Sequence, residues 1–134
     1  MQSAEILFHV GAGTLVLLGI AHTLAEVLGP RRALPPEVAE AILTMKNTRV
    51  AAPGREVPLY DLMRGFSLMM GLLLVALGAT QHLLATVAIE STATLSTCVG
   101  VSAIGLLMSV RYFFIVPTAF LTVATACFVG AWVL

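Results

Sequence analysis

Charged residues are scarce in this chain of 134 residues. They make up 10% of it, whereas hydrophobic residues make up 59% and the mean hydropathy is +1.01. A soluble domain carries about 25% charged residues, and a domain this small cannot bury so much apolar surface in its own core. The shortage of charge excludes an ordinary soluble domain and predicts one domain, residues 1–134, whose apolar surface faces lipid.

Cysteine and the common catalytic motifs are nearly absent as well. The two cysteines, Cys98 and Cys127, lie in apolar stretches, which excludes a disulfide framework and does not match the spacing of metal ligands. The chain has no phosphate-binding loop, nucleophile elbow or dinucleotide fingerprint. Its net charge of zero does not favour nucleic acid as a partner, and we expect no metal or other cofactor.

Four apolar segments are long enough to cross a bilayer, which takes about 20 residues at ~1.5 Å each. They run over residues 6–28, 62–89, 92–110 and 117–134. No basic residue precedes the first segment, as it would in a secretory signal, so we expect this segment to be retained. The predicted fold is an all-α, polytopic four-helix bundle in a membrane.

The connection over residues 30–60 is long and polar. Pro35 and Pro36, followed by Glu37, predict a short surface helix that reaches about Lys46. The stretch Ala51-Ala52-Pro53-Gly54 is typical of a loop. Pro30, after Gly29, is a strong stop for the first spanning helix.

Basic residues occur on only one side of the predicted membrane, the side of the long connection. They are Arg31, Arg32, Lys46, Arg49, Arg55, Arg64 and Arg111. The other side carries the acidic residues Glu5 and Glu90. Because basic residues near helix ends stay in the cytoplasm, we expect the connection inside, both termini outside, and the protein in the inner (plasma) membrane.

Small and polar residues mark the helix faces that we expect to pack inward. Lipid is as apolar as leucine, so helices in a bilayer associate through close packing and hydrogen bonds. At helical spacing the four segments carry, in order, Gly11, Gly19, His22 and Glu26; Arg64, Ser67, Gly71, Gly78 and His82; Ser91, Thr94, Cys98, Ser102, Gly105 and Ser109; and Thr118, Thr122 and Thr125. Plain packing explains the small residues, but it does not explain the ionisable ones.

Ionisable groups within spanning helices are costly and are candidates for function. His22 and Glu26 share a helical face, and a carboxylate beside an imidazole orients it for proton transfer. We predict a polar pocket near the cytoplasmic side, in which the catalytic residues are His22, Glu26, Asp61 and Arg64. The predicted substrate contacts are Tyr60, Ser67, His82 and Arg111.

A structural interpretation of the same residues stays open. Glu26 and Arg64 can form a salt bridge between the first two helices, and Asp61 can cap the second helix. In this interpretation Arg111 is a topology anchor and has no role in catalysis.

A haem site with two histidine ligands is a further hypothesis, because His9 and His82 lie at similar depth toward the outer side. By the helical angle, however, His9 points roughly 140° away from His22. We therefore do not expect His9 and His82 to face one cavity.

The run Tyr60-Asp-Leu-Met-Arg-Gly-Phe-Ser-Leu-Met-Met-Gly71 resembles the most recognisable stretch of a family of small bacterial four-helix integral membrane proteins of unknown function. In that family a histidine-bearing first helix precedes an acidic residue and a Gly-Phe-Ser-like second helix. The resemblance covers the first two segments. It implies the four-helix bundle and carries no activity with it.

The sequence therefore favours an acid–base enzyme of the isomerase, cyclase or epoxide-opening type, acting on a lipophilic small molecule. The alternative is a non-catalytic module that binds membrane lipid or supports assembly, including a homo-oligomer. A third hypothesis is a haem or quinone electron carrier.

Overall fold

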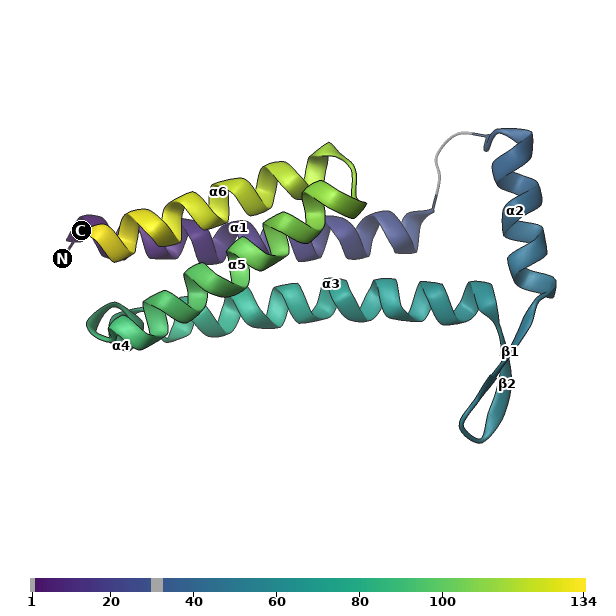
Figure 1. Cartoon of the computed structure of the whole chain (residues 1–134), viewed down its shortest axis with the longest axis horizontal. Coiled ribbons are helices and arrows are strands. Elements are labelled where there is room, and N and C mark those ends of the chain that lie inside the picture. The colour runs from purple at the N-terminus through teal and green to yellow at the C-terminus, as the bar shows by residue number, and fades with distance from the viewer. Residues whose placement is uncertain (1, 30–32) are drawn as a thin grey trace.

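The computed structural model describes residues 2–29 and 33–134. Its elements, in order, are α1 (Gln2–Leu28), α2 (Pro36–Asn47), β1 (Arg49–Ala52), β2 (Arg55–Pro58), α3 (Leu59–Leu83), α4 (Ala85–Glu90), α5 (Thr92–Tyr112) and α6 (Ile115–Val133) (Figure 1). Within the described residues, four helices are long and apolar enough to cross a membrane: α1, α3, α5 and α6. The prediction of four helices with the length and composition of membrane spans is confirmed.

The bundle has two unlike ends. At the end called here the terminal end, both chain termini lie beside α4 and the last turns of α3 (Figure 1). At the opposite, loop end, α1 stops at Leu28 and α3 begins at Leu59, next to α2 and the two strands. With 27 and 25 residues, α1 and α3 are ~40 Å long and continue past the turn that joins α5 to α6 (Figure 1). Of the four long helices, only α1 and α3 therefore reach the loop end, where α2 and the hairpin contact α3.

Helix α1 is the centre of the bundle. It packs along α3 on one side and along α6 on another, and α5 packs against α6. Figure 1 shows α5 crossing obliquely, from α4 at the terminal end to the turn before α6. The four long helices thus follow the spatial order α3, α1, α6, α5.

Glycines allow the backbones of α1 and α3 to approach closely. A Cβ atom added to Gly19 would lie 2.6 Å from the carbonyl oxygen of Gly71, and one added to Gly78 would lie 2.6 Å from that of Ala12. A Cβ atom on Gly71 would collide with the hydroxyl group of Thr23. These contacts confirm that the predicted small-residue faces of the first two spanning helices meet.

The hydrophobic core lies at the terminal end. Phe8 of α1 and Phe128 of α6 are fully buried, with ring centroids 5.3 Å apart and planes inclined by 59°. Small side chains fill the space around them; the buried ones include Ala4, Ala85, Ala88, Ala124 and Ala131. The core thus joins α1 and α6 to the short helix α4 and leaves the loop end outside it.

Hydroxyl groups join α5 to α6, as the small-residue pattern predicts. The Ser109 and Thr118 hydroxyl oxygens lie 2.9 Å apart, and Ser109, Ser102 and Cys98 are all buried. Ser91 caps α5, because its hydroxyl oxygen accepts a hydrogen bond from the Thr94 N–H.

Two element predictions need correction. Residues 62–89 do not form one helix, since α3 runs from Leu59 to Leu83 and α4 follows after a break at Leu84. The stretch 49–58 is a two-stranded antiparallel hairpin, in which Arg49 pairs with Pro58 and Gly54 turns with φ of 85°. Pairing of the backbones, rather than an apolar pattern, produces these short strands.

The surface helix predicted after Pro35 is present as α2. Gly29 ends α1 with φ of 66°, a conformation that favours glycine, and its N–H donates to the Ala25 carbonyl. Pro30, Arg31 and Arg32 lie outside the described residues.

Candidate functional site

A chain of polar contacts joins α1 to α3 at the loop end. His22 Nε2 lies 3.0 Å from the Ser67 hydroxyl oxygen and 3.1 Å from the Ser67 carbonyl oxygen. The Ser67 hydroxyl donates to Glu26 Oε2 at 3.0 Å, and Arg64 Nε lies 3.9 Å from Glu26 Oε1. We call these four residues the polar relay. Three of the four predicted catalytic residues belong to it, together with Ser67, which was predicted to contact substrate.

Helical spacing and close packing position the relay. His22 and Glu26 lie four residues apart on α1, and Arg64 and Ser67 lie three apart on α3, so each pair shares one helix face. The Gly19–Gly71 contact lies about one turn toward the terminal end. Because the backbones are so close there, the short side chain of Ser67 can reach both His22 and Glu26.

The hydrogen bonds determine where the protons lie. A carbonyl oxygen can only accept, so the contact to the Ser67 carbonyl requires a proton on His22 Nε2. In a neutral imidazole the other nitrogen, Nδ1, then carries a free lone pair. No hydrogen-bond partner of Nδ1 occurs among the described residues. Donation thus runs in one direction, from His22 through the Ser67 hydroxyl to the Glu26 carboxylate.

This order differs from that of a serine–histidine–acid triad. In a triad the histidine accepts the serine proton and the acid orients the histidine. Here His22 donates to Ser67, and Glu26 accepts from Ser67. The arrangement can pass a proton between His22 and Glu26, but it does not activate Ser67 as a nucleophile through His22.

The relay is half-open to its surroundings. The Glu26 side chain is 28% exposed and the Arg64 side chain 44% exposed, and the His22–Ser67 contact is partly buried. The predicted salt bridge between the first two spanning helices is therefore present, but it is long and exposed, which makes it a weak pair.

Asp61 does not join the relay in this structure. It lies in the first turn of α3, where Pro58 occupies the cap position, so the prediction that Asp61 caps the helix is wrong. Asp61 lines a pocket of about 250 Å³ between the hairpin and α3, together with Arg55, Val57, Leu62, Gly65, Phe66 and Met69. The hairpin, which the sequence pattern did not predict, brings Arg55 to this pocket.

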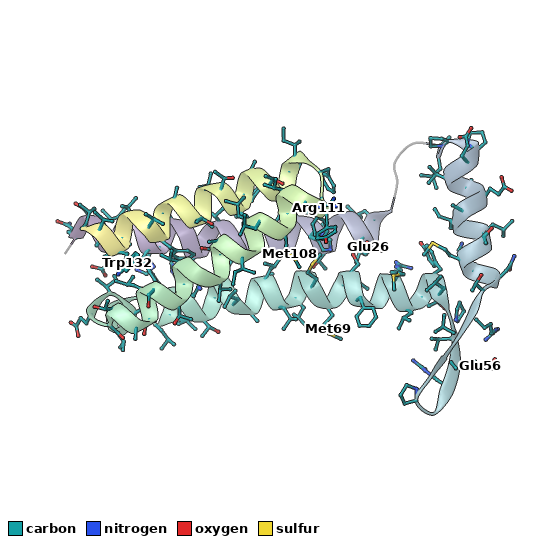
Figure 2. The ribbon with its side chains drawn as sticks, in the orientation of Figure 1. Glu26, Glu56, Met69, Met108, Arg111 and Trp132 are labelled. Carbon is teal, nitrogen blue, oxygen red and sulfur yellow. The ribbon has the colours of Figure 1, made fainter. Side chains whose placement is uncertain are left out.

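Tyr60 and Arg111 also lie at the loop end, with partners of their own. The Lys46 ammonium lies 5.1 Å from the centre of the Tyr60 ring, which attracts α2 to α3. The Arg111 guanidinium lies 5.3 Å from the ring of its neighbour Tyr112. Figure 2 shows Arg111 near the level of Glu26 along the bundle, as the predicted common depth requires. Among the described residues no hydrogen bond or ion pair joins Arg111 to the relay.

His82 lies far from the relay, at the terminal end, and contacts His9. Their Nδ1 atoms are 2.9 Å apart, and the ring centroids are 4.3 Å apart. The expectation that His9 and His82 would not face each other was wrong. The pair is exposed. His9 lies three residues before Ala12 and His82 lies four after Gly78, so the close approach of Gly78 to Ala12 places the two histidines on facing turns.

The His9–His82 distance does not match that of two haem ligands. Axial nitrogens lie on opposite sides of the iron, roughly 4 Å apart if each metal–nitrogen bond is about 2 Å. The two imidazoles instead contact each other, with no space for a macrocycle between them.

Comparisons with models of protein families, with curated proteins and with solved structures found no match. The resemblance to small four-helix membrane proteins stays a prediction. Function is therefore argued from the site itself.

Sequence reasoning weighed His9 only as a possible haem ligand, and it missed Arg55. The signal for His9 was its depth, which matches that of His82. Arg55 gave no such signal, because its position depends on the hairpin.

Proposed function

We propose that this chain is an integral protein of the plasma membrane, with the loop end in the cytoplasm, and that its polar relay carries out acid–base chemistry on a lipophilic substrate. The orientation is supported by the described basic residues, which all lie toward the loop end: Lys46, Arg49, Arg55, Arg64 and Arg111. The terminal end has Glu5 and Glu90 instead.

One observation carries the chemical part of the proposal: the unbroken order of donors from His22 through Ser67 to Glu26. The free Nδ1 lone pair of His22 takes a proton from the substrate. The Nε2 proton moves to the Ser67 oxygen as the Ser67 proton moves to the Glu26 carboxylate. The reverse sequence returns a proton to another position of the substrate. The reaction therefore consumes and releases no proton overall, as in an isomerisation or cyclisation.

Arg64 has an electrostatic role in this mechanism. Its guanidinium places a positive charge 3.9 Å from the Glu26 carboxylate, which accepts the proton in the proposed relay. Being exposed, it can also attract an anionic group of the substrate from the interface.

The substrate class follows from the surroundings of the relay. Large apolar side chains next to it are exposed on both helices, among them Leu24, Met63 and Phe66. In a bilayer these faces contact acyl chains, so a lipophilic molecule can approach His22 from the membrane without crossing water.

The substitution His22→Gln tests the mechanism. A glutamine amide can place a donor near the position of Nε2 and keep the bond to Ser67, but its carbonyl oxygen is not basic enough to take a proton as Nδ1 does. The protein, in nanodiscs made from the host's total lipid extract, is incubated in D₂O, and mass spectrometry follows lipid isomers and deuterium incorporation. We expect wild type to convert a lipid component and the variant to be slower by about 10²-fold or more.

Equal turnover by wild type and His22→Gln, or no conversion of any component by wild type, would count against catalysis by the relay. Thermal unfolding of the two proteins in the same nanodiscs serves as the control. A similar melting temperature shows that the lost rate is not lost structure.

A second candidate function, lipid binding without catalysis, is favoured by the pocket beside the hairpin. Arg55 and Asp61 carry opposite charges and line one pocket, yet they form no ion pair with each other among the described residues. A phosphoethanolamine headgroup carries both matching charges, a phosphate for Arg55 and an ammonium group for Asp61. Phe66 and Met69 extend the pocket along α3, where an acyl chain can lie.

Phospholipids that co-purify with the protein discriminate between these functions. The lipid-binding function predicts enrichment of phosphatidylethanolamine over phosphatidylcholine and phosphatidylglycerol, and loss of that enrichment in Arg55→Gln and Asp61→Asn. His22→Gln should keep the enrichment. If all four proteins carry the bulk lipid composition, the pocket has no headgroup preference and this candidate fails.

A further inference from the structure

The contact between His9 and His82 plays no part in the proposed chemistry. It lies at the terminal end, whereas the relay lies at the loop end, and it joins two helices that are already held together. The buried Phe8–Phe128 pair and the close approach of Gly78 to Ala12 provide the packing there. Two ionisable side chains within apolar helices are costly and call for another explanation.

The geometry of the pair suits a metal ion. Two nitrogens that bind one tetrahedral zinc ion at 2.0–2.1 Å lie about 3.4 Å from each other. The Nδ1 atoms of His9 and His82 are 2.9 Å apart, so a separation of about 0.5 Å more is enough. Side-chain rotation can supply such a shift, because the contact is exposed rather than locked in the core.

The proton balance is also simple. In the hydrogen-bonded pair one Nδ1 carries a proton that the other accepts. When a divalent cation binds, the Nδ1 proton moves through water to Nε2 of the same ring, so both imidazoles coordinate through Nδ1 as neutral ligands and no net proton is released. The cation then replaces the hydrogen bond as the link between α1 and α3.

We propose that His9 and His82 form a two-histidine site for a borderline divalent transition metal ion, with Zn²⁺ as the type case. Imidazole ligands suit zinc, copper and nickel rather than magnesium or calcium. Among the described residues no third His, Cys, Asp or Glu completes a ligand set, so water occupies the remaining positions. Glu5 lies four residues before His9 on α1 and provides negative charge toward the same helix face.

The test uses purified protein without a histidine tag, in detergent, titrated with ZnCl₂ by calorimetry and by thermal unfolding. We expect saturable binding of one zinc ion per chain and a melting temperature that rises with zinc concentration. MgCl₂ at the same concentrations should leave the melting temperature unchanged.

The matched variants are His9→Asn, His82→Asn and His22→Gln. Asparagine can place an amide near the position of Nδ1 and so keep a hydrogen bond between the helices, but it removes the metal ligand. Zinc affinity should fall more than about ten-fold in either asparagine variant, since losing even an outer partner of a ligand costs roughly 10–100-fold. His22→Gln should bind zinc like wild type.

Two results would overturn the proposal: no saturable zinc binding by wild type, or equal affinity in wild type and both asparagine variants. Cu²⁺ offers a second readout, because nitrogen ligands appear in its electron paramagnetic resonance spectrum. That signal should be present in wild type and in His22→Gln and reduced in the asparagine variants. A failure of zinc binding leaves the proton relay untouched, since the two sites share no residue.

Discussion

The two ends of the α1–α3 pair are built from the same two helices, yet they differ in what surrounds them. At the terminal end α4 and α6 cover the pair, and a core formed around Phe8 and Phe128 excludes other molecules. At the loop end neither α5 nor α6 extends along the pair, only α2 and the hairpin contact α3, and the α1–α3 interface holds His22, Ser67 and Glu26. Packing partners therefore decide which end holds the buried core and which end leaves its polar side chains partly exposed.

The glycine contacts between the two ends explain how one helix pair can have a buried core at one end and a polar interface at the other. Gly19 and Gly71 allow the backbones of α1 and α3 to approach closely between the two ends. The two helices can therefore stay in contact at the loop end although no other long helix packs on them there. The polar side chains at this end form hydrogen bonds with one another.

Substitution of phenylalanine should show the largest contrast between the ends. Phe8→Ala empties a fully buried site, whereas Phe66→Ala trims a side chain that is 57% exposed at the loop end. We expect Phe8→Ala to lose about 2–3 kcal/mol, somewhat less than in a soluble core because lipid also solvates the unfolded chain's rings. Phe66→Ala should change stability by less than about 0.5 kcal/mol. Reversible unfolding in mixed micelles measures both, and equal losses would contradict the placement of the core.

The next largest effect should come from the glycine contact itself. Gly19→Ala adds a Cβ atom 2.6 Å from the Gly71 carbonyl oxygen, whereas Gly13→Ala adds one with no neighbour within 4 Å. We expect Gly19→Ala to destabilise by about 1–3 kcal/mol. Gly13→Ala should be neutral or stabilise the helix by up to about 1 kcal/mol. Melting temperatures in the same detergent compare the two, and a harmless Gly19→Ala would argue against close α1–α3 packing.

Loss of the relay hydroxyl should have a smaller effect on stability. Ser67→Ala removes the group that links His22 to Glu26, and hydrogen bonds between helices in membranes are worth about 0.6–2 kcal/mol. Ser96→Ala is the control, because Ser96 is exposed and its hydroxyl bonds only to its own helix at Ala93. Thermal unfolding should place Ser67→Ala about 1 kcal/mol below wild type and Ser96→Ala level with it. The relay contributes no link between the helices if the two variants melt together.

The smallest effect is expected for the ion pair. Arg64 and Glu26 are separated by 3.9 Å and both are partly exposed, so Arg64→Gln should cost less than about 0.5 kcal/mol. Salt should reduce even this difference. Unfolding at low and high ionic strength checks it, and a loss above 1 kcal/mol that persists in salt would assign Arg64 a larger structural role.

Much of the candidate site followed from helical periodicity. His22 with Glu26 and Arg64 with Ser67 lie at spacings that place them on shared faces, and the neighbouring glycines indicate which faces meet. The direction of donation could not be predicted, because it depends on Ser67 lying between the histidine and the carboxylate. Asp61 lies at the loop end as predicted, but it lines the pocket beside the hairpin and does not contact the relay.

The sequence by itself determined the four apolar helices, the one-sided distribution of basic residues and the faces of α1 and α3 that pack together. These features depend on composition and on a fixed rise and rotation per residue, which hold along any helix. Only the tertiary structure decided that Asp61 and Arg55 line one pocket and that His9 contacts His82. Such pairings depend on how helices cross, where a hairpin folds back and how far a side chain extends, and none of these is a property of one segment alone.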